Sequence, residues 1–358
     1  MTPRINRREF AMGSVAAPLL AGASPVLPGI WRFRFGTPEK LTPVAKRHYP
    51  PANDALAALP SVAHPPRTAT GEASRGGYLV HIPLEPAEMI YGLGLQLQSF
   101  LQRGLKKKLR VNADPSIDSG DSHAPVPFYV TTRGYAVLID TARYATIYCG
   151  NKRKKNSGPA SKQSGGEVGA NLLPSAYARF RANEASEVLI EIPRAAGVDV
   201  YVFGGPTMRN AVQRYNLFSG GGALPPRWGL GFWYRCFGQF DQAQVLAMAA
   251  DLRESKIPCD VLGLEPGWQS HAYSCSFVWS DKFPDPDGTL RKLADSNFRV
   301  NLWEHAFTHP TSPIYKPLLP LSGDYEVWDG LTPDFLDPRA RRIFADFHDK
   351  EHVASGVA

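Results

Sequence analysis

The sequence of 358 residues lacks several patterns that would assign a function directly. No stretch is long and apolar enough to span a membrane. None of the four cysteines forms a CxxC pair, so we expect no metal site, and four are few for a disulfide scaffold, although one bridge stays possible. No basic face is interleaved with aromatic residues, which argues against nucleic-acid binding. We expect no cofactor, and the oligomeric state is left open.

The first 30 residues have the pattern of an export signal. Arg7 and Arg8 precede a modest apolar segment at residues 11–23, and the small residues 21–23 offer a cleavage site. We predict a twin-arginine signal peptide at residues 1–30, which would place the protein in the periplasm or outside the cell. The alternative is a chance basic pair before an alanine-rich helix.

Residues 31–220 have the pattern of a β-sandwich. Residues 77–83 alternate between apolar and polar side chains, and residues 127–132 and 135–140 predict two strands around a tight turn. Short strands separated by turn residues are typical of a sandwich. Further strands are predicted at residues 144–148, 176–181, 187–192 and 198–202.

A linker separates this region from a second domain at residues 225–358. A helical pattern at residues 206–218 precedes three consecutive glycines and the pair Pro225-Pro226. Apolar runs then alternate with amphipathic segments, as in parallel strands that are joined by helical crossovers. The strands are predicted at residues 228–233, 261–264 and 298–303, and the helices at residues 242–255, from 286 and 339–350.

The helix starts and the last residues complete this prediction. Asp241 and Gln244 form a capping box, and Asp285 and Asp337 each precede a proline at the first helical position. Residues 353–358 resemble the start of a fourth strand. Three or four strands cannot close a parallel barrel, so we predict a β-sandwich followed by an incomplete (β/α)8 TIM barrel.

Two carboxylates follow the predicted barrel strands directly. In α/β barrels the carboxyl ends of the strands carry the chemistry, and these are the positions of Glu265 and Glu304. Paired carboxylates are what glycoside cleavage requires, so the residues alone suggest an acid/base pair.

Tryptophans stand at the same strand ends. Trp233, Trp268 and Trp303 could stack on the apolar face of a sugar or belong to the barrel core. We favour a sugar pocket for Trp268 and Trp303, and the core for Trp228.

The order of several motifs is similar to that of glycoside hydrolase family 31. The motifs LPPRWGLGFW (224–233), IPCDVLGLEPGW (257–268), FVWSDKFPDP (277–286), NFRVNLW (297–303) and residues 328–342 resemble the opening of the family's catalytic barrel. Upstream, residues 91–94 and 127–135 are similar to its galactose-mutarotase-like N-terminal sandwich.

The resemblance implies a retaining α-glycosidase that acts on an oligosaccharide or another α-glycoside by double displacement. The family's nucleophile is an Asp just after the fourth strand, and its acid/base is a later Asp. Neither position exists in these 358 residues, so no residue here is assigned as catalytic. We expect the chain alone to be inactive and poorly soluble.

One departure from the family bears on the sugar. Family α-glucosidases usually carry Asp-x-Asp after the second strand, where Glu265 and Gly267 stand here. The resemblance implies that Glu265 binds sugar hydroxyls, with a structural hydrogen bond as the alternative. It favours a galactoside weakly over a glucoside or xyloside.

Two more residues are candidates for substrate contact. Glu304 could bind substrate or form a buried ion pair with Arg235 or His305. Asp121 lies in a polar loop that in this family reaches over the barrel mouth, although a solvated turn is the simpler interpretation. The main alternatives to an α-glycosidase are an inactive truncated product and a non-catalytic carbohydrate-binding protein.

Overall fold

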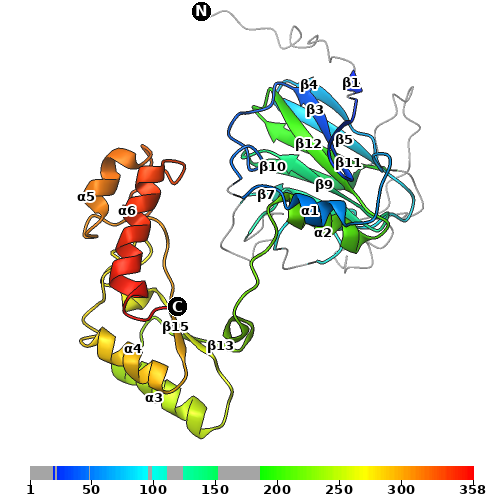
Figure 1. The fold of residues 1–358 in the computed structure, drawn as a ribbon. Coiled ribbons are helices and arrows are strands. Elements are labelled where there is room, and N and C mark those ends of the chain that lie inside the picture. The colour runs from blue at the N-terminus through cyan, green and yellow to red at the C-terminus, as the bar shows by residue number, and fades with distance from the viewer. Residues whose placement is uncertain (1–18, 21, 48, 96–98, 111–123, 152–185) are drawn as a thin grey trace, which may run out of the picture. The chain divides into compact units, whose positions relative to one another are not determined.

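The computed structural model describes residues 19–20, 22–47, 49–95, 99–110, 124–151 and 186–358. The chain divides into two compact units, Met1–Gly222 and Ala223–Ala358 (Figure 1). The division falls within the predicted linker of glycines and prolines. None of the helices in the described ranges has the length and apolar character needed to cross a membrane.

The first unit contains two six-stranded antiparallel sheets in its described part. Their strand orders are β1-β4-β5-β11-β10-β7 and β2-β3-β12-β9-β8-β6. The first sheet comprises β1 (Leu19–Leu20), β4 (Thr70–Ser74), β5 (Gly77–Leu84), β7 (Lys106–Leu109), β10 (Ala145–Asn151) and β11 (Ser186–Pro193). The second comprises β2 (Ser24–Leu27), β3 (Ile30–Gly36), β6 (Ile90–Gly92), β8 (Phe128–Thr131), β9 (Tyr135–Asp140) and β12 (Gly197–Gly204).

One apolar cluster joins the two sheets. Alternate side chains point to opposite faces of a strand, so Val80 and Ile190 from one sheet meet Val137 and Val200 from the other. The opposite face of the second sheet lies under α1 (Asn53–Ala57) and α2 (Met208–Phe218) (Figure 1). Strands β9 and β12 are therefore buried along their whole length.

Most of the strands predicted in this unit are present, with ends shifted by a few residues. The predicted strand at residues 135–140 is β9, and it pairs with β8 across the predicted tight turn. Three predictions fall outside the described residues: the strand at residues 176–181, the site residue Asp121 and the pair Arg7-Arg8. Strand β2, within the predicted signal segment, pairs with β3, and the export signal stays a prediction.

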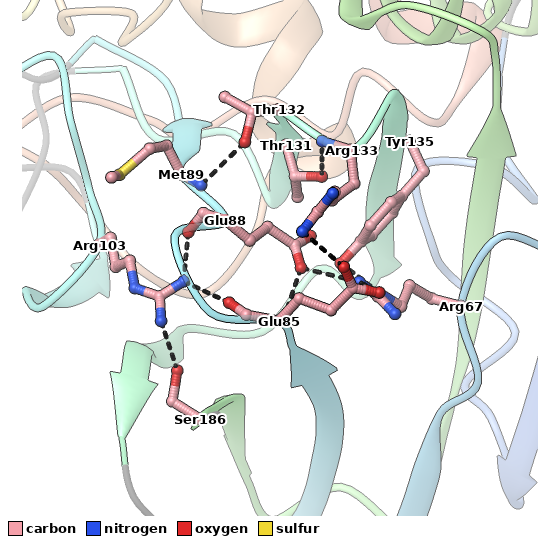
Figure 2. A network of polar contacts seen from close by, with 10 residues as sticks. All are labelled: Arg67, Glu85, Glu88, Met89, Arg103, Thr131, Thr132, Arg133, Tyr135 and Ser186. Atoms are coloured by element: carbon pink, nitrogen blue, oxygen red, sulfur yellow. Dashed lines mark hydrogen bonds and ion pairs between the residues drawn. The ribbon is translucent and has the colours of Figure 1, made fainter. Parts of the chain in front are cut away.

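A buried carboxylate is neutralised at one edge of this unit (Figure 2). Glu88 is fully buried and lies 2.9 Å from the Arg67 guanidinium, which also contacts Glu85 at 2.8 Å. Burial lowers the pKa of Arg67, but Tyr135 and the two carboxylates raise it by more. Arg103 donates to the backbone carbonyls of Glu85 and Glu88. The network holds a buried charge that would otherwise oppose folding.

The second unit is built on a three-stranded parallel sheet. Its order is β13 (Trp233–Cys236), β14 (Val261–Leu264) and β15 (Arg299–Leu302). Helices α3 (Gln242–Glu254) and α4 (Pro286–Asp295) lie side by side and bury one face of it (Figure 1). The remaining elements are η2 (Arg227–Leu230), η3 (Pro266–Trp268), α5 (Tyr315–Leu318), η4 (Leu319–Leu321), α6 (Pro338–His348) and the π-helix η5 (Asp349–Val353).

The first strand of this sheet begins later than predicted. Residues 228–233 were expected to form it, but residues 227–230 form η2 and pairing starts only at Trp233, opposite Val261. Pro226 is extended and leads into the turn, and the Gly231 N–H bonds to the Trp228 carbonyl instead of a neighbouring strand. The prediction of a strand at residues 228–233 was therefore wrong, because only its last residue belongs to β13.

The last residues pair as predicted. Val357 forms a parallel bridge to Val300 of β15, and the Ala358 N–H donates to the Val300 carbonyl at 2.9 Å. The chain thus adds to the sheet beside β15 where the sequence predicted the start of a fourth strand.

The predicted capping box at α3 is present and its contribution can be measured. The Gln244 N–H donates to Asp241 at 2.9 Å, and the Asp241 N–H donates to the Gln244 side chain at 3.0 Å. We expect Asp241→Ala to lower the free energy of unfolding of this unit by about 1 kcal/mol. Urea denaturation would measure it, with the exposed Asp251→Ala on the same helix as a control expected to change less than about 0.5 kcal/mol.

A buried histidine makes the first unit sensitive to pH. His81 on β5 lies 3.1 Å from Glu187 and 3.3 Å from Glu72. Glu187 raises the pKa of His81 most, burial opposes this, and Glu72 adds to the rise. The folded state therefore holds the proton more tightly. Its stabilisation is complete below the ordinary pKa of about 6.5 and is lost as the pH rises through the raised value.

We expect His81→Gln to destabilise β5 by about 1 kcal/mol more at pH 6 than at pH 9. Hydrogen exchange of peptides from β5, followed by mass spectrometry at both pH values, would measure the difference. The exposed His64→Gln in the same unit is the control. Equal effects of His81→Gln at the two pH values would contradict the assignment.

Candidate functional site

The parallel sheet has one apolar face and one face of polar and aromatic side chains. Leu262, Leu264 and Val300 point to α3 and α4, where they are buried. The neighbouring side chains point the opposite way because the period of a strand is two. The register aligns that second face in two rows, listed from the amino end as Trp233, Val261 and Arg299, then Arg235, Gly263 and Asn301. Glu265 and Trp303 follow directly after β14 and β15, at the carboxyl end of the sheet.

Glu265 lies at the carboxyl end of the sheet. The Glu265 N–H donates to the Cys236 carbonyl at 3.3 Å, so the residue continues the ladder of β14. Its Oε1 lies 2.7 Å from Nε of Arg235, and the two side chains are 17% and 74% exposed. Glu265 therefore stands at the accessible edge of the sheet and carries a cationic partner.

Trp303 continues β15 into a group of aromatic rings. Its N–H donates to the Leu264 carbonyl at 2.9 Å, and its ring centroid lies 4.5 Å from His305 and 5.9 Å from Tyr273. Trp328 lies 5.6 Å from Tyr273 and 5.1 Å from His305. Tyr273 and Trp328 are more than half exposed, and burial lowers the pKa of His305. The group offers an aromatic surface beside Glu265.

Two of the predicted sugar-stacking tryptophans lie elsewhere. Trp268 is 1% exposed within the core, and its indole N–H donates to the Trp303 carbonyl at 2.8 Å. Trp233 begins β13, so it lies in the row farthest from Glu265. Trp228 was predicted to be core but is half-buried in η2, with the Arg299 guanidinium 5.9 Å from its ring.

Glu304 has a different ionic partner from Glu265. It follows Leu302 by two residues and lies 2.9 Å from Nε2 of His348 on α6, without hydrogen-bond alignment. Burial lowers the pKa of His348, but Glu304 and the Phe344 carbonyl raise it by more. An ion pair was one of the two predictions for Glu304, but its partner is neither Arg235 nor His305. The two predicted carboxylates therefore have different cationic partners.

The loops that carry the aromatic rings are joined to each other. Cys275 is fully buried, its Sγ accepts from the His305 N–H at 3.2 Å, and its N–H donates to the Phe307 carbonyl at 2.6 Å. His271 and His309 stack with ring centroids 3.4 Å apart. Burial lowers the pKa of His309, and the neighbouring His271 lowers it further. The loop after β14 is therefore fixed against the loop after β15.

Gly267 cannot carry a side chain in this arrangement. A Cβ atom built there would lie 1.8 Å from the Gly238 carbonyl oxygen. The turn after β13 thus lies directly against the turn after β14, which accounts for glycine where an Asp was expected from the resemblance.

Four residues of this region were not predicted as site residues: Arg235, Tyr273, His305 and Trp328. Strand alternation from Glu265 could have found Arg235, but the ring contacts depend on loop conformations in which Tyr273 and Trp328 have positive φ angles of 72° and 50°. Within the described ranges, no group of three or more His, Cys, Asp or Glu side chains could hold a metal ion.

Comparison with known proteins gives the family and its relatives. Residues 222–358 match the glycosyl hydrolases family 31 TIM-barrel domain. The chain is 26% identical over 275 residues to alpha-xylosidase XylQ of Lactiplantibacillus pentosus, covering 72% of this chain and 32% of XylQ. It is 27% identical over 165 residues to neutral alpha-glucosidase AB of Sus scrofa, covering 42% of this chain and 17% of that protein.

Solved structures share the fold. The family 31 dextranase of Flavobacterium johnsoniae, complexed with glucose, superposes with a TM-score of 0.68 at 16% identity, over 96% of this chain and 47% of that one. The xylosidase of Aspergillus niger gives a TM-score of 0.63 at 13% identity, over 96% and 54%. The chain spans about a third of XylQ and less of the other curated relatives named here. The second unit of this chain is therefore similar to the TIM-barrel domain of glycosyl hydrolase family 31.

Proposed function

We propose that the complete protein is a retaining α-glycosidase that hydrolyses α-xylosides or α-glucosides. The observation that carries this proposal is the position of Glu265 and Trp303, which continue two neighbouring parallel strands at their carboxyl ends, in a unit that matches the family's TIM-barrel domain. Barrel enzymes place their active sites at this end. In this proposal the three strands begin a (β/α)8 barrel, and the first unit is the galactose-mutarotase-like sandwich.

Glu265 and Trp303 hold the sugar in this proposal. Oε1 of Glu265 contacts Arg235, and Oε2 has no hydrogen bond to any described residue, so Oε2 can accept from a sugar hydroxyl. The rings around Trp303 can stack on the apolar face of a pyranose, because aromatic surfaces bury such faces favourably.

The sugar that fits best has no bulky group at C6. Glu265 is one methylene longer than the Asp of the family pattern, and the Arg235 side chain occupies space beside it. Both features favour xylose, which lacks the C6 hydroxymethyl group. Relatives named as alpha-xylosidases agree with this choice. The galactoside preference predicted from the sequence has no support among the relatives compared above.

Two further carboxylates complete the proposed reaction. Retaining glycosidases use a nucleophile and an acid/base about 5–5.5 Å apart. Glu265 is paired with Arg235 and Glu304 with His348, so each of these two carboxylates already has a cationic partner. We therefore assign neither Glu265 nor Glu304 as the nucleophile or the acid/base.

Export is also part of the proposal, because Arg7 and Arg8 precede an apolar segment. We expect the double substitution Arg7→Lys and Arg8→Lys to retain the protein in the bacterial cytoplasm, since twin-arginine export depends on that pair. Cell fractionation with immunodetection would measure the distribution. Replacing Arg4 with lysine is the control, and unchanged export of the double variant would exclude a twin-arginine signal.

The proposed activity predicts hydrolysis of p-nitrophenyl α-glycosides by the complete protein. We expect the highest kcat/KM with the α-xyloside or α-glucoside, a lower value with the α-galactoside, and no hydrolysis of β-anomers. Initial rates of p-nitrophenol release would measure this. Sugar binding without turnover of any α-glycoside would favour the non-catalytic carbohydrate-binding alternative.

Trp303→Ala tests whether the aromatic surface holds the sugar in that assay. Loss of a stacking contact is expected to lower kcat/KM by about tenfold. Tyr325→Ala is the matched control, because Tyr325 is an exposed aromatic residue of the same unit that has no ring contact with Trp303. Equal effects of the two substitutions would remove Trp303 from the proposed site.

A further inference from the structure

An ion pair crosses two strands at the accessible edge of the parallel sheet. Arg235 on β13 lies opposite Gly263, and its side chain reaches Glu265, two residues further along β14. With 74% of the Arg235 side chain exposed, solvent screens the pair, so it contributes little to stability. Folding alone therefore does not explain an arginine at this position.

Gly263 leaves room for the Arg235 side chain to extend along β14 to Glu265. A Cβ atom built at Gly263 would lie 3.8 Å from its nearest neighbours, which is an ordinary contact. Backbone crowding therefore does not require glycine there. Its lack of a side chain instead opens the surface of β14 between the backbone of Arg235 and the carboxylate of Glu265.

Both members of the pair keep unused hydrogen-bonding capacity. A guanidinium has five N–H donors, and only Nε contacts a carboxylate oxygen, at 2.7 Å. Within the described ranges, neither the four terminal N–H groups of Arg235 nor Oε2 of Glu265 makes another hydrogen bond. The pair thus presents donors and an acceptor side by side.

The chemistry of this pair selects a class of ligand. Its two charges cancel, so a neutral ligand fits better than a sugar acid, whose carboxylate Glu265 would repel. Trp303 in the adjacent position supplies a surface for the apolar face of the same ring.

We propose that Arg235 is a specificity-determining residue that, with Glu265, recognises two neighbouring hydroxyls of a neutral sugar. The guanidinium donates to one hydroxyl oxygen, and Oε2 of Glu265 accepts from the next hydroxyl. This inference rests on the proposed function, in which Glu265 and Trp303 hold the sugar, and it adds a residue to which neither the resemblance nor the relatives assign a role.

The test uses the complete protein with Arg235→Gln and Arg235→Lys. The substrates are p-nitrophenyl α-xyloside and its 2-, 3- and 4-deoxy analogues. We expect Arg235→Gln to lower kcat/KM about tenfold on the parent xyloside, mainly through KM, as for one lost charge-assisted hydrogen bond. On the analogue that lacks the hydroxyl bound by Arg235, the same substitution should change kcat/KM less than twofold.

Arg235→Lys and Arg299→Gln are the comparison variants. Lysine keeps the positive charge but lacks the planar guanidinium. We therefore expect Arg235→Lys to lower kcat/KM by less than Arg235→Gln does, and again only on substrates that carry the hydroxyl bound by Arg235. Arg235→Lys also keeps the test possible if Arg235→Gln does not fold. Arg299 is exposed on the same face but in the row at the amino end of the sheet, and its substitution should leave kcat/KM unchanged.

Two kinetic outcomes would overturn the inference. If Arg235→Gln lowers kcat/KM equally on the parent xyloside and on every deoxy analogue, Arg235 only holds Glu265 in place. If Arg235→Gln leaves kcat/KM unchanged on all of them, Arg235 has no role in recognition. If no α-glycoside is hydrolysed, the proposed function fails, and calorimetric titration with xylose and the deoxyxyloses decides the inference separately. Hydroxyl-dependent binding that is weakened in Arg235→Gln would support it, and absent binding would overturn it.

Discussion

The alternation of side chains along three parallel strands is the constraint on which the second unit depends. Leu264 points to the core under α3 and α4, so Glu265 must point to the other face. The helices cover one face, and the other face carries polar and aromatic side chains at the carboxyl ends of the strands. Burial of one row of residues thereby determines which residues are free to meet a ligand.

The alternation of side chains also explains why two carboxylates at similar positions in the sequence have different surroundings. Glu265 and Glu304 each follow a parallel strand, but Glu265 directly follows β14 whereas Glu304 comes two residues after the end of β15. This one-residue difference in phase turns Glu304 to the side of α6, where His348 meets it. Position relative to the strand register, and not proximity to a strand end, decides which partner each carboxylate meets.

Much of the fold could be predicted from the sequence because its signals are local. Strands β9 and β14 and the capping box of α3 depend on runs of a few residues, and their predicted positions are correct. The start of β13 was wrong, because its apolar run contains two glycines and is equally compatible with η2. The burial of Trp268 also escaped prediction, since it depends on η3, which turns the indole beneath Trp303.

The contact between Gly267 and the Gly238 carbonyl links these observations to specificity. Because no side chain fits at position 267, the second carboxylate of the family pattern cannot be accommodated while the two turns touch. The remaining carboxylate, Glu265, is instead accompanied by Arg235 from the neighbouring strand. A pattern of two acidic groups is thus replaced by one acid and one base. The exchange replaces two groups that only accept hydrogen bonds with a pair that both donates and accepts, and it removes the net negative charge of the two acids.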